Sequence, residues 1–127
     1  KKGIRVIPLV GPSSILLALM ASGLNGQCFT FHGYLPIEEI ERKKSIAALE
    51  TESAKRNQTQ MFIETPYRNE KLFNALLVNC RPQTRLCIAA DITLPSEYIV
   101  TYSIAQWKAQ ATPQLNKRPS IFLLLAV

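Results

Sequence analysis

Several chemically versatile side chains stand together in the segment Met61-Phe-Ile-Glu-Thr-Pro-Tyr-Arg68. Glu64 supplies a carboxylate that could accept a proton, and Arg68 supplies a guanidinium that could hold a carboxylate or a phosphate. The apolar residues before Glu64 are typical of a buried strand, and Glu70 to Asn79 has the composition of a helix. Polar groups at the carboxyl end of a strand in an open α/β sheet lie where ligands bind. The segment therefore predicts a binding site.

A structural interpretation of the same residues stays open. Thr65 and Pro66 are residue types that cap and begin helices. Arg68 could form an ion pair with Glu64 at the start of that helix, and such a pair contributes little when it is exposed.

Two other segments could contact a ligand. Gly11-Pro12-Ser13-Ser14 is typical of a helix start, where free N–H groups and hydroxyls can bind an anion or simply cap the helix. Ala89-Ala90-Asp91-Ile92-Thr93 is rich in small residues at a predicted strand end. Small residues there would admit a flat ring close to the backbone, or would serve tight packing of the strand against a helix.

Familiar catalytic motifs are absent from the sequence. There is no GxGxxG, no GxxxxGK[ST] and no GxSxG. Ser14, His32 and Asp91 include the residue types of a triad, but their spacing does not favour one, and His32 is interpreted as a structural or exposed strand residue. One histidine and three cysteines without a CxxC pair predict no metal site, and they favour free thiols in a reducing compartment, hence a cytoplasmic protein.

The net charge of +6 is compatible with a polyanionic partner such as RNA, or with a solvated surface. The basic residues cluster at Lys1-Lys2, Arg42-Lys43-Lys44, Lys55-Arg56 and Lys117-Arg118. No aromatic residue interleaves with these clusters, so the stacking half of a single-strand-binding signature is missing.

The elements that must position these residues can be read from periodicity. Strands are predicted over Gly3–Leu9, Cys28–Tyr34, Gln60–Ile63, Thr84–Ala90, Glu97–Ser103 and Ser120–Val127. Helices are predicted over Ile15–Ser22, Glu38–Glu52, Asn69–Asn79 and Ile104–Gln110, the last anchored by Trp107. Lys55–Gln58 is predicted to be a polar link.

The fold class predicted from this order is α/β, with a mixed β-sheet of about five strands flanked by helices. Two strands follow each other without a helix between them, Thr84–Ala90 and Glu97–Ser103, which implies at least one antiparallel pair. The 127 residues suit one domain. No apolar run approaches the roughly 20 residues that cross a bilayer, so no membrane association is expected. The first residue is Lys rather than Met, which suggests part of a longer protein.

Taken in order, six segments resemble the tetrapyrrole methylase superfamily, and within it the ribosomal RNA methyltransferases. They are Val6–Ser14, Ala21–Leu24, Phe31–Pro36, Phe62–Glu64 with Arg68, Ala89–Thr93 and Pro119–Phe122. The match spans nearly the whole chain.

This resemblance implies the C-terminal domain, residues 11–127, of a two-domain methyltransferase that uses S-adenosylmethionine, with residues 1–10 as the interdomain strand or linker. It implies an RNA substrate, a ribose 2′-hydroxyl of ribosomal RNA, and a homodimer. The cofactor would lie between the two domains, and no catalytic residue is assigned. The cofactor-binding residues that the resemblance implies are Ser13, Ser14, Ile63, Glu64, Ala90, Asp91, Ile92, Pro119, Ser120 and Ile121.

The chain departs from the ribosomal RNA enzymes at Thr65-Pro66-Tyr67, where a serine-threonine-histidine sequence is expected, and it lacks the methionine-glycine of the tetrapyrrole enzymes around Glu64. Two alternatives therefore stay open. One is a methyltransferase that acts on a tetrapyrrole or another small molecule. The other is a basic RNA-binding or dimerisation domain without enzymatic activity.

Overall fold

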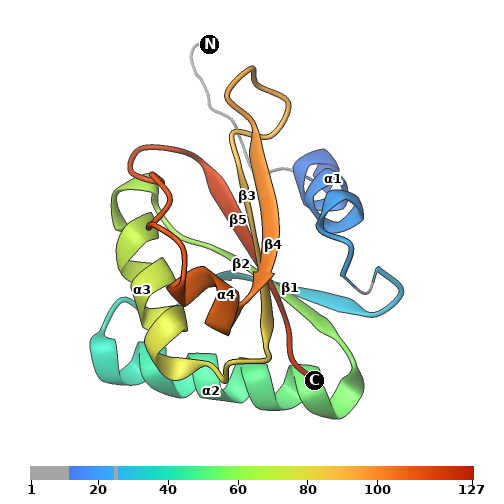
Figure 1. Ribbon diagram of the computed structural model, residues 1–127. Coiled ribbons are helices and arrows are strands. Elements are labelled where there is room, and N and C mark those ends of the chain that lie inside the picture. The colour runs from blue at the N-terminus through green and yellow to red at the C-terminus, as the bar shows by residue number, and fades with distance from the viewer. Residues whose placement is uncertain (1–11, 25) are drawn as a thin grey trace.

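A five-stranded sheet forms the centre of the computed structural model, which describes residues 12–24 and 26–127 (Figure 1). The strand order is β1-β2-β5-β3-β4. The strands are β1 (Phe29–Tyr34), β2 (Thr59–Ile63), β3 (Arg85–Ala90), β4 (Tyr98–Ser103) and β5 (Ser120–Leu125). The helices are α1 (Pro12–Ser22), α2 (Glu39–Arg56), α3 (Asn69–Asn79) and α4 (Ile104–Lys108), with a 3₁₀ turn η2 at Pro66–Arg68. The predicted fold class is confirmed, whereas the predicted strand Gly3–Leu9 and the linker 1–10 lie outside the described residues.

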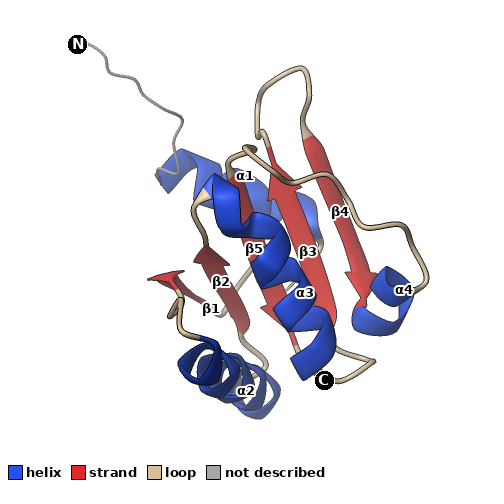
Figure 2. Cartoon of the chain, turned by 90° about the vertical axis from the view of Figure 1, so that its left-hand side faces the viewer, coloured by secondary structure: helices blue, strands red, loops and turns tan. Residues whose placement is uncertain are grey.

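The central strand β5 is buried at all six positions, Ser120-Ile-Phe-Leu-Leu-Leu125. Ile121, Leu123 and Leu125 belong to the apolar cluster on the α1 side of the sheet. Phe122 and Leu124 belong to the cluster on the opposite side, where α2, α3 and α4 lie (Figure 2). A strand that packs on both faces is a continuous apolar run rather than an alternating one, and this explains the composition of the segment.

The strand directions bring three chain segments together at one end of the strands. β1 and β2 are parallel. β5 runs antiparallel to both of its neighbours, β2 and β3, and β3 is antiparallel to β4. The carboxyl ends of β2 and β3 therefore flank the beginning of β5. The predicted antiparallel pair of β3 and β4 is confirmed.

Helix α2 is longer than its sequence pattern predicted. Its first turn is capped by the Glu38 carboxylate, which accepts hydrogen bonds from the backbone N–H groups of Ile40 (3.2 Å) and Glu41 (3.0 Å). The helix ends at Arg56, because Asn57 adopts the left-handed conformation (φ 51°) that terminates helices. The prediction of a polar link from Lys55 was wrong for Lys55 and Arg56, whose charged side chains suit the negative end of the helix dipole.

Helix α4 is short and is held by one aromatic residue. Ser103 and Gln106 form a reciprocal capping box at its start. Trp107 is buried, and its indole N–H donates to the Leu86 carbonyl at 2.8 Å. The predicted role of Trp107 as an anchor agrees with these contacts, although the helix ends at Lys108.

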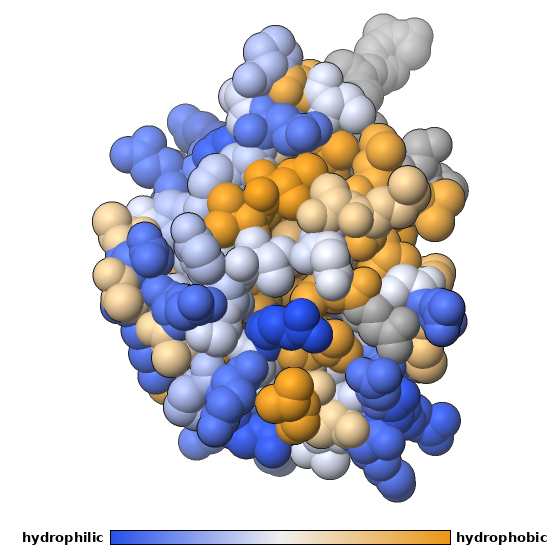
Figure 3. Space-filling model, turned by 45° about the vertical axis from the view of Figure 1, so that its right-hand side comes forward, coloured by the Kyte–Doolittle hydropathy of each residue, from blue (hydrophilic) through white to orange (hydrophobic). Residues whose placement is uncertain are grey.

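The two faces of the sheet are covered unequally. Three helices lie on one face, and within the described residues only α1 lies on the other (Figures 1 and 2). Large apolar side chains gather on the surface around α1 and β1 (Figure 3). The exposed ones include Leu16, Leu17 and Met20 of α1 and Phe29 and Phe31 of β1. We refer to these five residues as the α1 face.

Candidate functional site

The sheet edge at the carboxyl ends of β2 and β3 collects most of the predicted cofactor residues. Ile63 of β2 pairs with Ile121 of β5, and Ile121 pairs on its other side with Ala89 of β3. The Asp91 backbone N–H donates to the Pro119 carbonyl at 3.0 Å. Segments 63–64, 90–92 and 119–121, which lie far apart in the sequence, are therefore neighbours. We call this end of the sheet, where β2 and β3 finish and β5 begins, the strand edge.

The side chains at the strand edge divide between the two faces of the sheet. Ile121 belongs to the apolar cluster on the α1 side, and Ile63 and Ile92 pack against that cluster. Ala90 is fully buried in the opposite cluster. The buried Ser120 donates its hydroxyl to the Arg118 carbonyl at 2.9 Å. The small side chain of Ala90 thus packs in the core, which agrees with the interpretation that small residues here serve tight packing.

Ser13 and Ser14 occupy the first turn of α1. The next residue, Ile15, packs against the same apolar cluster as Ile63 and Ile92. The helix start and the strand edge therefore share one apolar cluster. Gly11, the first residue of that predicted motif, lies outside the described residues.

Glu64 is the most enclosed charged group at the strand edge. Its side chain is 1% exposed and contacts two arginines, Arg42 from α2 (3.3 Å) and Arg68 from η2 (3.3 Å). The backbone N–H of Thr65 also donates to the Glu64 carboxylate, at 2.7 Å. With three donors bound to it, this carboxylate is committed to structure and is not free to act as a base.

The predicted helix start after Glu64 needs one correction. Pro66 does open a helical turn, η2, but Thr65 makes no side-chain capping bond to it. The Thr65 hydroxyl is buried without a hydrogen-bond partner. The expected ion pair between Arg68 and Glu64 exists. Its carboxylate is buried rather than exposed.

Asp91 is held by a second arginine-centred network. The Arg118 Nε donates to the Asp91 carboxylate at 2.8 Å, and the Ser96 hydroxyl donates to the same oxygen at 2.9 Å. Arg118 also donates to the backbone carbonyls of Ser96 (2.7 Å) and Gln114 (2.8 Å). Its guanidinium lies 5.7 Å from the centre of the Tyr98 ring.

The loop after β3 has a strained backbone. Asp91 (φ 52°) and Thr93 (φ 71°) both adopt the left-handed conformation, which is costly for residues other than glycine. The Glu97 carboxylate accepts from the Thr93 N–H at 2.7 Å. Such strain persists only where surrounding contacts impose it, and it concentrates at binding sites. We call residues 91–97 the β3–β4 loop.

The structure does not bring Ser14, His32 and Asp91 together as a triad. His32 lies on the edge strand β1, which the two strands β2 and β5 separate from β3. Three strand spacings of the usual size amount to roughly 14 Å. His32 is exposed, as its structural interpretation expected. Over the described residues, no group of histidine, cysteine and carboxylate side chains is arranged to hold a metal ion. Within the same residues, no helix is long and apolar enough to span a membrane.

Arg42 and Arg118 are the two residues of this region that the sequence interpretation missed. Arg42 was grouped with Lys43 and Lys44 as part of a basic cluster. A signal was nevertheless present, because Arg42 shares the helical spacing of Ile46, Leu49 and Ser53, which are all buried. No comparable spacing marks Arg118, whose carboxylate partner Asp91 lies in a distant loop.

Comparison with known proteins gives similarity along almost the whole chain. Ribosomal RNA small subunit methyltransferase I of Vibrio cholerae is 29% identical over 123 residues, which cover 97% of this chain and 41% of that protein. The Bacillus subtilis protein of the same name is 39% identical over 101 residues, which cover 80% of this chain and 33% of that protein. The chain thus spans less than half the length of these relatives. No family model matches it.

Solved structures share the fold at low sequence identity. The methyltransferase CobJ superposes with a TM-score of 0.60 at 16% identity, covering 89% of this chain and 47% of that chain. A cobalt precorrin-4 methyltransferase superposes with a TM-score of 0.55 at 13% identity, with the same coverage of both chains. The predicted resemblance to ribosomal RNA small subunit methyltransferase I is confirmed by the sequence relatives, and the predicted resemblance to the tetrapyrrole methylase superfamily is confirmed at the level of the fold.

Proposed function

We infer that this chain is the C-terminal part of an S-adenosylmethionine-dependent methyltransferase, with residues 11–127 as its second domain. The observation that carries the proposal is the convergence at one sheet edge of the three segments that the family resemblance assigns to the cofactor. The sequence similarity to ribosomal RNA small subunit methyltransferase I supports it.

The residues at the strand edge fit a cofactor held largely by backbone groups. Segments 63–64, 90–92 and 119–121 offer strand ends whose side chains are mostly packed or paired, so a ligand would contact the backbone groups that the pairing of the strands leaves free at these ends. The strained and multiply anchored β3–β4 loop is a preorganised wall of the kind that binding sites use. Ser13 and Ser14 would contribute from the first turn of α1.

Methyl transfer requires alignment more than a nucleophilic side chain. S-adenosylmethionine supplies a methyl group on a sulfonium sulfur, which is activated towards displacement. The contribution of this chain is then to orient the reactants and exclude water. Glu64 would contribute to this orientation structurally, because it fixes Arg42 and Arg68 beside the strand edge.

We propose ribosomal RNA as the substrate, with the ribose 2′-hydroxyl as the methylated group. The names of the relatives and the net charge of +6 support an RNA substrate. The tetrapyrrole alternative has weaker support, because the solved cobalamin enzymes share only the fold. The proposal includes a homodimer, for which the α1 face offers apolar surface. It also includes a cytoplasmic location, which agrees with the free thiols of Cys28, Cys80 and Cys87.

Calorimetric titration of the intact protein with S-adenosylmethionine tests the cofactor assignment. We expect saturable binding with one cofactor per chain. A folded protein that releases no heat and shows no binding by equilibrium dialysis would sink the proposal. Transfer of a labelled methyl group to small-subunit ribosomal RNA, with a porphyrinoid as the parallel substrate, then separates the RNA enzyme from the tetrapyrrole enzyme.

A basic RNA-binding domain without enzymatic activity is the second candidate. The occupied Glu64 carboxylate favours it, since the strand edge then offers no free acid or base at that position. RNA binding that depends steeply on salt and is indifferent to S-adenosylmethionine would support this candidate over the first.

A further inference from the structure

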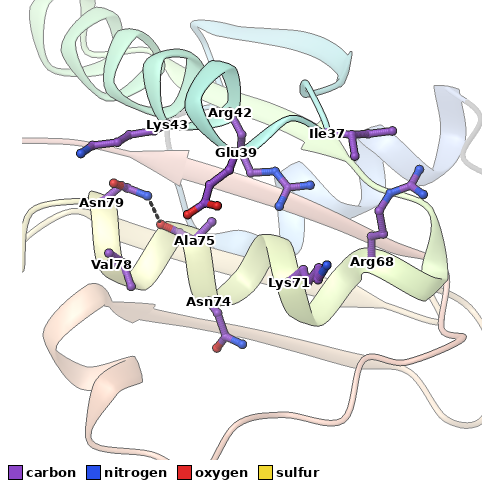
Figure 4. Close-up of a pocket in the computed structure, with 10 residues that line it drawn as sticks. All are labelled: Ile37, Glu39, Arg42, Lys43, Arg68, Lys71, Asn74, Ala75, Val78 and Asn79. Atoms are coloured by element: carbon purple, nitrogen blue, oxygen red, sulfur yellow. Dashed lines mark hydrogen bonds between the residues drawn. The ribbon is translucent and has the colours of Figure 1, made fainter.

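A groove between α2 and α3 carries an excess of positive charge (Figure 4). Its volume is about 440 Å³, within the range of ligand pockets. Four cations line it, Arg42 and Lys43 from α2, Arg68 from η2 and Lys71 from α3. Glu39 is the carboxylate among the lining residues, and the buried Glu64 pairs with the two arginines. Cations therefore outnumber carboxylates by two.

The two arginines are held in fixed positions at one end of the groove. The Arg42 side chain is 9% exposed and donates to the Glu64 carboxylate and, through Nε at 3.1 Å, to the Pro36 carbonyl. Arg68 is bound to the other oxygen of the same carboxylate. Figure 4 shows the Arg42 guanidinium between α2 and α3, and Arg68 at the right-hand end, beside the start of α3. A buried charged pair of this kind presents preorganised N–H donors at low entropic cost.

The two lysines of the groove have no counter-ion of their own. Among the described residues, neither Lys43 nor Lys71 forms an ion pair, although Lys44, Arg56 and Arg81 elsewhere on the surface do. Both lysines are exposed. Their charges remain available to an anionic ligand.

Exposed apolar side chains line the groove together with the cations. Ile37 and Val78 line the groove and are largely exposed. Tyr67 is also exposed and precedes Arg68 in η2. Basic side chains that follow a backbone, together with an aromatic side chain on which a base can stack, form the signature of single-strand binding. Tyr67 is the aromatic residue beside a groove cation, because it is the neighbour of Arg68 in the chain.

We propose that the groove between α2 and α3 binds the phosphate backbone of a single-stranded RNA segment, with Tyr67 stacking on a base. This inference rests on the proposed function and names the surface that receives its substrate. Glu64 links the groove to the strand edge, because it is the residue after Ile63 and the partner of both groove arginines. RNA seated in the groove is thereby held at a fixed position relative to the cofactor segments.

Fluorescence anisotropy of a labelled single-stranded RNA, titrated with the intact protein at several KCl concentrations, tests the groove. Variants K43A, K71A and the double variant remove exposed charges, and K108A on α4 is the matched control outside the groove. Each groove lysine should contribute about 0.7 to the slope of log K against log salt, and its loss should weaken binding about fivefold at 0.1 M salt. Y67A should weaken binding and leave the salt slope unchanged.

Unaltered RNA affinity and salt slope in K43A/K71A, with the fold intact by circular dichroism, would overturn the inference. Displacement of the RNA by polyglutamate of equal charge would also overturn it, since the groove would then be a general polyanion or acidic-peptide site. A third result would overturn it as well. In that case inorganic phosphate changes the NMR chemical shifts of the groove residues, but the affinity for RNA is the same with and without the two lysines. S-adenosylmethionine binding is measured in parallel on the wild type and on each variant. If the wild type does not bind the cofactor, the proposed function fails, and this result is independent of the RNA measurements.

Discussion

Glu64 shows how much one buried carboxylate can organise. Its side chain is 1% exposed and binds two guanidinium groups that come from different elements. Removing one partner of a buried charged network costs more than the pair contributes, because the remaining charge is left without compensation.

Replacing Glu64 by Gln should therefore lower the free energy of unfolding by about 3 kcal/mol, a loss measurable by urea denaturation. Glu52→Gln is the matched control, because the pair between Glu52 and Arg56 is largely exposed and should contribute less than about 0.5 kcal/mol. Equal effects of the two substitutions would contradict the structural role of Glu64.

The two buried thiols predict a pH dependence. Burial raises the pKa of Cys80 to about 12 and that of Cys87 to about 11, from an ordinary value of 9.0. The folded state therefore keeps both protons at pH values where the unfolded chain has already lost them. The stability from these thiols is complete below pH 9 and is lost as the pH rises through 11 to 12.

Urea denaturation between pH 8 and pH 11 checks this sign. Each thiol should steepen the alkaline loss of stability by up to about 1.4 kcal/mol per pH unit. Cys87→Ala should lower stability at pH 8, because it opens a small cavity, and should show a shallower decline above pH 9. Parallel pH profiles for the variant and the wild type would refute the assignment.

Among the elements, the β3–β4 loop depends most on a residue outside itself. Arg118 anchors this loop at Asp91 and at the Ser96 carbonyl. Two left-handed residues in the loop, Asp91 and Thr93, need such anchoring to keep their conformation. The loop should therefore be stiff at the position where it borders the strand edge.

Arg118→Ala should release this loop. We expect amide hydrogen exchange in residues 92–97 to become about tenfold faster, which corresponds to a loss of roughly 1.4 kcal/mol of local stability. On the proposed function, the affinity for S-adenosylmethionine should fall as well. Arg85→Ala, an exposed arginine on β3, is the control and should change neither quantity.

The elements themselves were largely predictable, and the reasons are local. A continuous apolar run after Ser120 marks β5, and Pro12 and Trp107 mark the start of α1 and the position of α4. The extension of α2 to Arg56 was missed, because polar composition was interpreted as a link. The left-handed Asn57 that ends the helix is visible only in the backbone.

The predicted site was less accessible from the sequence than the fold was. The order of the strands, with β5 between β2 and β3, decides that residues 63–64, 90–92 and 119–121 become neighbours. Neither periodicity nor composition contains that information, and the family resemblance supplied it. Arg42 and Arg118, the partners of Glu64 and Asp91 that were missed, lie 22 and 27 residues away from them in the sequence, a separation at which no local rule operates.

Across the whole molecule, the unequal covering of the sheet leaves the α1 face exposed. Isolated exposed apolar residues are ordinary, but contiguous ones mark surfaces that meet another protein surface. The proposed homodimer would bury this face.

Met20→Glu should then shift the intact protein from dimer towards monomer, as measured by light scattering after gel filtration. Ile40→Glu, at an exposed position on α2, is the control and should leave the mass unchanged. A dimer that persists in the Met20 variant would show that its interface lies elsewhere.

The position of β5 has a consequence for how the chain is made. The strand at the centre of the sheet is the last of the described strands to be synthesised, so β2 and β3 leave the ribosome before the strand that joins them exists. Until then their inner edges carry unpaired backbone groups and apolar side chains, which makes such intermediates prone to aggregation. Formation of the five-stranded sheet is therefore a late event, and a chain that ends before Ser120 would lack the strand that joins the β1–β2 pair to the β3–β4 pair.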